Sequence, residues 1–210
     1  MIRAYQEIYL SRAQAALGDA FDYAINVCNI LGADFVKLFT ASTVSKRLEN
    51  GEPAYLSGKS GIEIVLDIVL EAAGRQLEAT QQERMERSRE YWIGWAVAYY
   101  QWYSGKTFET ICKRISYEDI RNVYGVLHEA DPSKAADVFS RMMNSGQETN
   151  LAVQRKKRGL SQSQLAKAAD ISIRSIQLYE QRKADIGKAQ YNHLTAIAKV
   201  LGCTVDDILE

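Results

Sequence analysis

Residues 159–180 constrain the fold of this chain more than any other stretch. Ser161 stands where a helix N-cap is expected, because its hydroxyl can accept a backbone N–H that the first helical turn leaves unpaired. Apolar residues then recur at helical spacing as far as Asp170, and Ser172 offers a second N-cap directly after it. The pattern predicts two short helices joined by a tight turn.

The second of these helices, expected at about 172–181, has two distinct faces. Ile176 and Tyr179 supply its inner face. Four residues between or beside them are left to point outward: Ile173, Arg174, Ser175 and Gln177. A helix with an apolar inner face and a polar outer face, placed after a short helix and a tight turn, is how a helix is presented to the DNA major groove.

Further residues of the C-terminal segment match a pattern that is known from other proteins. They are Arg158-Gly159-Leu160-Ser161-Gln162, Leu165-Ala166, Ile171-Ser172, Ile176, Tyr179-Glu180, Leu194, Ile197-Ala198, Leu201-Gly202 and Ile208-Leu209. On these residues, 149–210 resemble the helix-turn-helix domain of the Xre/Cro/lambda-repressor type. The resemblance implies five helices, expected at about 150–158, 162–169, 173–181, 190–201 and 205–209. It does not extend to 1–147, for which we recognise no family.

The resemblance also implies which side chains meet DNA. Base contacts are expected from Ile173, Arg174 and Gln177, since a guanidinium can pair with guanine, a carboxamide with adenine and an alkyl group with the thymine methyl. Phosphate contacts, which add affinity without sequence choice, are expected from Ser161, Gln162, Ser172, Ser175, Arg182, Lys183 and Lys188. Arg155 and Glu180 match positions that form an internal ion pair in some relatives, so we assign them to structure.

One departure from the family pattern falls in the turn. Asp170 stands where glycine is usual. Aspartate tolerates the left-handed backbone conformation better than most residues do, so we expect the turn to survive.

Charge is distributed unevenly along a chain whose formal net charge is zero. Residues 151–199 hold 10 Lys/Arg against 3 Asp/Glu, a net +7, whereas 1–147 hold 16 against 19. Positive charge concentrated on a helix-turn-helix is the electrostatic footprint of a nucleic-acid binder. A solvated basic face would explain a charge excess taken alone.

The first 147 residues are expected to be helical throughout, because strand-like alternation is nearly absent. Helices are predicted at about 3–16, 19–31, 33–48, 61–74, 91–103, 107–114 and 116–127, and from 132 onward. The charged segment 76–89 is expected to be a solvated lead-in to the helix at 91–103. The polar segment 144–150 predicts a boundary between an N-terminal domain, 1–147, and a C-terminal domain, 148–210.

Two features of the N-terminal domain have a functional and a structural interpretation. Gly58-Lys59-Ser60 resembles a phosphate-binding loop, but the first glycine of that motif would fall at Pro53. Ser60 and Glu63 instead predict a capping box at a helix start. Rings that recur on one face of the helix at 91–103 are expected to form the core, with an aromatic ligand pocket or a partner groove as the alternative: Trp92, Trp95, Tyr99 and Trp102.

The sequence predicts no catalytic residues, cofactor or metal site. The three cysteines lie far apart without a CxxC pair, as is usual for reduced thiols in the cytosol, and the two histidines lack partners at metal-ligand spacing. The most apolar run, 91–103, is shorter than the about 20 residues that a membrane span needs. We therefore expect a cytoplasmic, all-α protein that is not an enzyme and does not bind membranes.

The leading hypothesis is a sequence-specific DNA-binding transcriptional regulator of the Xre type. It would bind double-stranded DNA as a homodimer, since relatives pair such readers on two half-sites. Its N-terminal domain would dimerise or receive a signal from a protein partner or a small-molecule effector. The alternative is an antitoxin-like protein whose N-terminal domain neutralises a partner while the helix-turn-helix autoregulates its operon.

Overall fold

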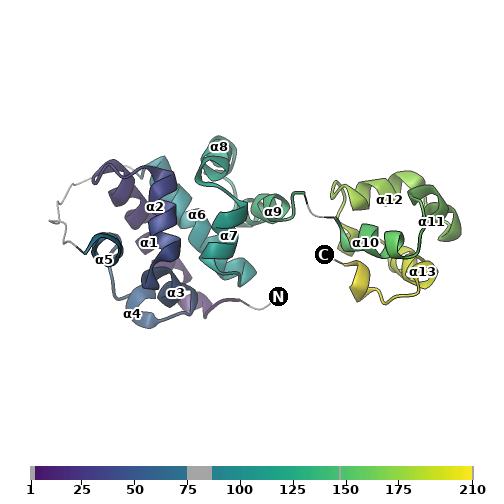
Figure 1. Ribbon diagram of the computed structural model, residues 1–210, viewed down its shortest axis with the longest axis horizontal. Coiled ribbons are helices and arrows are strands. Elements are labelled where there is room, and N and C mark those ends of the chain that lie inside the picture. The colour runs from purple at the N-terminus through teal and green to yellow at the C-terminus, as the bar shows by residue number, and fades with distance from the viewer. Residues whose placement is uncertain (1–2, 75–86, 147, 210) are drawn as a thin grey trace. The chain divides into compact units, whose positions relative to one another are not determined.

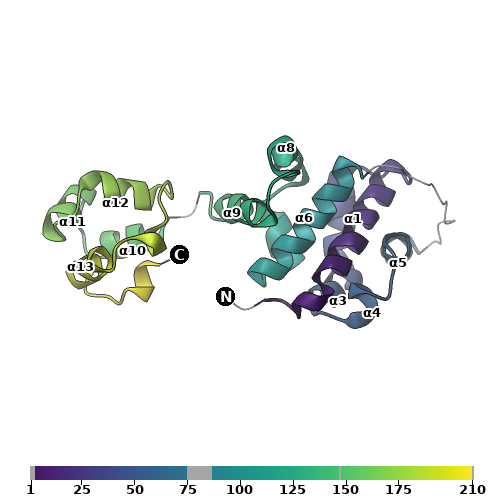
Figure 2. The same ribbon diagram turned by 180° about the vertical axis from the view of Figure 1, so that it is seen from behind.

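The computed structural model describes residues 3–74, 87–146 and 148–209, and every regular element in these ranges is a helix. Contacts divide the chain into two compact units, Met1–Met143 and Asn144–Glu210 (Figures 1 and 2). Most of the predicted lead-in at 76–89 lies outside the described residues. None of the helices in the described ranges is long and apolar enough to cross a membrane.

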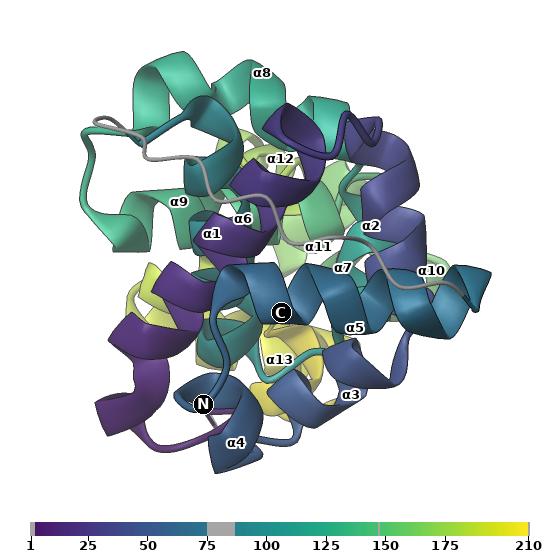
Figure 3. The same cartoon turned by 90° about the vertical axis from the view of Figure 1, so that its left-hand side faces the viewer.

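The N-terminal unit contains the helices α1 to α9. Their bounds are α1 Leu10–Asn26, α2 Gly32–Ala41, α3 Thr43–Glu49, α4 Pro53–Leu56, α5 Gly61–Ala73, α6 Arg89–Ser104, α7 Phe108–Arg114, α8 Tyr117–Leu127 and α9 Pro132–Met143, after a 3₁₀ turn at Glu7–Tyr9. Helix α1 packs along α6, and α5 crosses α1 (Figure 3).

The close pairing of α1 and α6 depends on two glycines inside these helices. A Cβ added at Gly94 would lie 2.3 Å from the carbonyl oxygen of Leu17, and one added at Gly18 would lie 2.8 Å from the ring of Tyr91. Small residues at these crossings let the two backbones approach. The prediction of two helices at 3–16 and 19–31 is therefore wrong: α1 runs unbroken through Gly18, which is a packing site and not a helix end.

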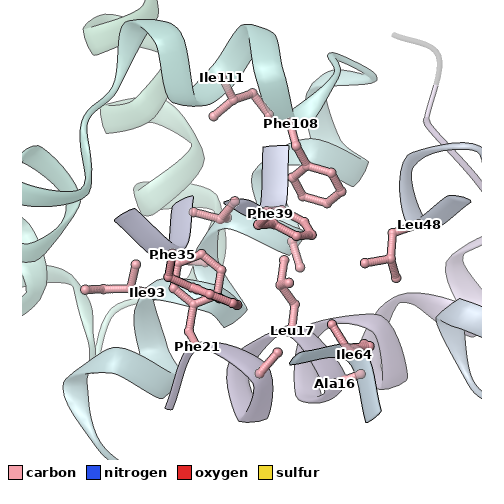
Figure 4. Close-up of a cluster of buried hydrophobic side chains, with 14 of the residues drawn as sticks. Ala16, Leu17, Phe21, Phe35, Phe39, Leu48, Ile64, Ile93, Phe108 and Ile111 are labelled. Carbon is pink, nitrogen blue, oxygen red and sulfur yellow. The ribbon is translucent and has the colours of Figure 1, made fainter. Parts of the chain in front are cut away.

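The core of this unit is mostly aliphatic, and phenylalanine rings meet at its centre. Phe21 of α1 meets Phe35 of α2 edge-to-face at 5.1 Å between ring centroids, and Phe39 meets Phe108 of α7 at 4.9 Å (Figure 4). All four side chains are buried. Edge-to-face contacts of this kind add to the stability that area burial alone supplies.

The predicted aromatic core on α6 is correct only in part. Trp102 is buried, but Trp92, Trp95 and Tyr99 are half-buried and pack around the core. The fully buried side chains of α6 include Ile93 and Tyr100. Gly94 lies on the face of α6 toward α1, where an added Cβ would lie 2.3 Å from the Leu17 carbonyl oxygen.

Side-chain caps set the helix starts. Ser60 and Glu63 form the predicted capping box at α5. Ser42 Oγ accepts the N–H of Ser45 and begins α3, so the single helix expected at 33–48 is in fact two, α2 and α3. The carboxylate of Glu71 accepts the backbone N–H of Thr43 at 2.9 Å and so fixes the start of α3 from another helix.

The C-terminal unit contains four α-helices and two 3₁₀ helices. Their bounds are α10 Asn150–Lys157, α11 Gln162–Ala168, α12 Ile173–Glu180, η2 Ile186–Lys188, α13 Tyr191–Leu201 and η3 Asp206–Ile208. The fifth expected helix is thus the short η3, and η2 was not expected. The core of this unit buries Ile176 and Ile186, and Leu160, Tyr179 and Val205 are half-buried against it.

Candidate nucleic-acid interface

The turn between α11 and α12 follows from two residues. Asp170 adopts a left-handed conformation, with φ of 54°, as its tolerance for that region predicts. Ser172 then caps α12, its hydroxyl accepting the N–H of Ser175 at 3.0 Å. The backbone N–H of Ile171 donates to the carbonyl of Ala166 at 2.9 Å and closes the turn.

Helix α12 packs on the rest of the C-terminal unit through its inner side, and its outer side faces away from that packing. Ile176 is fully buried against Leu165 and Ala166 of α11 in one apolar cluster. On the outer side Arg174 is exposed, Ile173 has 45% of its surface exposed, and Gln177 is half-buried. None of the three predicted base-contacting side chains makes a hydrogen bond or an ion pair within the described part of the chain.

Of the three serines predicted to contact phosphate, Ser161 and Ser172 act as helix caps, and Ser175 lies in the first turn of α12. Ser161 Oγ accepts the N–H of Gln164 at 3.1 Å, and Gln164 Oε1 accepts the N–H of Ser161 at 2.7 Å, which completes a capping box at α11. The hydroxyls of Ser172 and Ser175 lie 2.8 Å apart. Ser161 and Ser172 are exposed, so capping leaves these hydroxyl groups at the surface.

A buried ion pair lies behind the outer face of α12. Arg155 Nε lies 2.6 Å from Glu180 Oε1, and Arg155 Nη2 donates to Glu180 Oε2 at 2.8 Å. The third donor, Arg155 Nη1, reaches the carbonyl of Leu160 at 2.7 Å. The two ends of the pair belong to α10 and α12, so the pair ties the recognition-helix candidate to the first helix of the unit.

Gln162 belongs to this same cluster. Its Nε2 donates to Glu180 Oε2 at 2.8 Å, so the amide that was predicted to meet a phosphate is held by a carboxylate inside the domain. Burial raises the pKa of Glu180, but the hydrogen bonds from Arg155 and Gln162 outweigh it and hold that pKa below its usual range. Glu180 therefore stays ionised and joins α10, α11 and α12.

The three basic residues predicted to contact phosphate after α12 differ in their surroundings. Arg182 has a φ of 53°, and its guanidinium donates to the carbonyls of Asn144 at 3.1 Å and Glu148 at 3.4 Å. It binds the segment before α10, which was not expected of a phosphate contact. Lys183 and Lys188 are exposed, and Lys188 lies 3.7 Å from Asp185.

Comparison with known proteins identifies this unit. Residues 151–208 match a family model described as helix-turn-helix. The C-terminal unit is a helix-turn-helix domain. The matched segment begins in α10 and ends with η3, and it corresponds to the Xre/Cro/lambda-repressor resemblance seen in the sequence. No curated protein and no solved structure matches the chain.

The helix-turn-helix match indicates what the C-terminal unit binds. Domains of this family are DNA-binding modules of regulatory proteins and not enzymes. The match leaves out the first 150 residues. The activity supported by the comparison is therefore DNA binding by the C-terminal unit alone.

Proposed function

We propose that this chain is a sequence-specific transcriptional regulator that places α12 in the DNA major groove. The observation that carries the proposal is the contrast between the two sides of α12. Its inner side is fixed by Ile176 and by the Arg155–Glu180 pair. On the outer side Ile173, Arg174 and Gln177 make no side-chain hydrogen bond or ion pair within the described residues. A reader of DNA needs this combination of a rigid support and free donors.

Each outward residue has a chemical role in the proposal. Arg174 donates two hydrogen bonds to a guanine, and Gln177 pairs with an adenine. Ile173 contacts a thymine methyl. Lys183 and Lys188 add phosphate contacts that raise affinity for every sequence.

The regulator is proposed to act as a homodimer on two half-sites about one helical turn apart. A single helix-turn-helix domain presents only a few base contacts, so two copies read a longer site than one. Analytical ultracentrifugation of the full chain, with and without its DNA site, measures this state directly.

The experiment selects a DNA site from a random library with the full-length protein and then measures affinity at several salt concentrations. Arg174→Ala should cost about 1–3 kcal/mol of binding and relax the preference at one base pair. Lys183→Ala should weaken binding to all DNA sequences alike. It should also reduce the slope of log affinity against log salt concentration by about 1. Lys199→Ala, an exposed change on α13 outside the predicted contact set, is the control. If no sequence is enriched and neither variant alters DNA binding, the proposal fails.

A further inference from the structure

The N-terminal unit has a cavity of about 300 Å³ between the start of α6 and the end of α8. The rings of Trp92, Trp95, Tyr91 and Tyr124 line it, with Arg87 and His128. Trp92 and Tyr124 meet edge-to-face at 5.5 Å between ring centroids, and Tyr124 stacks on His128 at 4.5 Å. A cavity of this size lies at the lower end of the range for small-molecule sites.

The cavity lining carries hydrogen-bond donors that the described residues do not use. The indole N–H groups of Trp92 and Trp95 make no hydrogen bond within the described part of the chain. Trp102, on the same helix, shows the usual arrangement, since its Nε1 donates to the carbonyl of Tyr5 at 2.9 Å. Buried or half-buried indoles normally find an acceptor, so two indoles without one leave room for an acceptor from a ligand.

The charged groups that line the cavity favour a negatively charged ligand. The lining residues include a guanidinium and an imidazole but no carboxylate. The guanidinium of Arg87 lies over the ring of Tyr91 at 4.6 Å, and it forms no ion pair with a described residue. Burial raises the pKa of the nearby Asp19, and the charge of Arg87 opposes that rise only in part. Outside the lining, Glu129 Oε1 lies 3.6 Å from His128 Nε2, and the Glu129 side chain is 88% exposed.

We propose that this cavity binds a planar aromatic carboxylate. Its ring would pack against Trp92, Trp95 and Tyr124, and its carboxylate would accept hydrogen bonds from Arg87. Guanidinium–carboxylate pairs are the strong, two-point kind of charge-assisted hydrogen bond. The proposal stands apart from DNA binding, because it concerns the N-terminal unit alone.

The test uses 2-naphthoate as the probe and 2-naphthylmethylammonium, a cation with the same ring, as its counterpart. Titration calorimetry on the full-length protein should detect naphthoate and give an affinity at least about tenfold weaker for the cation. Naphthoate should also quench tryptophan emission, because two of the three tryptophans line the cavity.

Two variants of the cavity lining and one control variant assign the binding to this site. Arg87→Gln should weaken naphthoate binding at least about tenfold, since the loss of even one charge-assisted hydrogen bond has that effect. Arg114→Gln removes an exposed guanidinium of α7 that does not line the cavity, and it should leave the affinity within about twofold. Trp95→Leu should weaken binding and reduce the quenching, with circular dichroism as the check on folding.

Three results would overturn the proposal. They are an absence of naphthoate binding, equal affinity for the anion and the cation, or an Arg87→Gln variant that binds naphthoate as the parent does. If Trp95→Leu does not fold, the comparison of Arg87→Gln with Arg114→Gln still tests the proposal. Selected-DNA binding by the same variants is a separate readout, so a failure here does not bear on the DNA-binding proposal.

Discussion

Arg155 and Glu180 form a two-point ion pair that joins α10 to the last residue of α12, with side chains only 11% and 6% exposed. Glu180 also accepts a hydrogen bond from Gln162 of α11. Three of the four α-helices of the unit therefore meet at one carboxylate. The position of the proposed DNA-reading helix depends on this contact as well as on apolar packing.

Removing the carboxylate should destabilise the C-terminal unit strongly. Glu180→Gln leaves Arg155 buried without its counter-charge, a change that costs about 3 kcal/mol. Urea unfolding followed by circular dichroism measures the loss. Glu148→Gln is the matched control, since it breaks an exposed pair with Lys156 and should cost below about 1 kcal/mol. Equal losses in both variants would contradict the role given to Glu180.

The same pair predicts a dependence on pH. The folded-state pKa of Glu180 is lowered. Its contribution to the free energy of unfolding is therefore complete above the unfolded-state pKa, about 4.3, and is lost as pH falls through the folded-state pKa. The stability gap between the parent and Glu180→Gln should thus be constant from pH 7 to 5 and shrink toward pH 3. Urea titrations at these three pH values provide the measurement. A gap that persists undiminished at pH 3 would argue against an ionic origin.

A small residue is required where α11 meets α12. Ala166 is 4% exposed, so Ala166→Leu should cost about 2 kcal/mol through overpacking. Ala168→Leu makes the same chemical change at an exposed position of the same helix and should be nearly neutral. Thermal unfolding of the two variants compares them, and similar melting temperatures would show that the helices do not cross closely at Ala166.

Two glycine-to-alanine replacements should change the stability of the N-terminal unit in opposite directions. Gly94→Ala places a Cβ 2.3 Å from the Leu17 carbonyl and should destabilise the N-terminal unit by about 2 kcal/mol or more. At Gly125, in α8, an added Cβ meets nothing within 4 Å, so Gly125→Ala should stabilise by about 0.5–1 kcal/mol. Denaturant midpoints give both values. A neutral Gly94→Ala would refute the close approach of α1 and α6.

Local patterns predicted much of the C-terminal unit and of the helix starts. Helical periodicity placed the helices near α10 to α13, and the spacing of Ser60 and Glu63 predicted their capping box. Such features depend on residues a few positions apart, which a sequence displays directly. The outward placement of Arg174 followed from the same periodicity.

Features that depend on distant residues could not be predicted in this way. Gly18 lies in the break expected between 3–16 and 19–31, and its packing partner, Tyr91, is remote in the sequence. Gln162 and Arg182 were expected at phosphates, but Glu180 and the carbonyl of Asn144 are acceptors that only the folded chain brings near them. In each case the folded chain supplies a partner that local sequence patterns do not show.

The three tryptophans of the chain, Trp92, Trp95 and Trp102, all lie on α6, and the helix-turn-helix domain has none. Tryptophan emission during unfolding therefore records the N-terminal unit alone, whereas helical ellipticity records both units. Two optical signals from one sample can thus separate the melting of the DNA-binding domain from that of its neighbour, without a label and without cutting the chain.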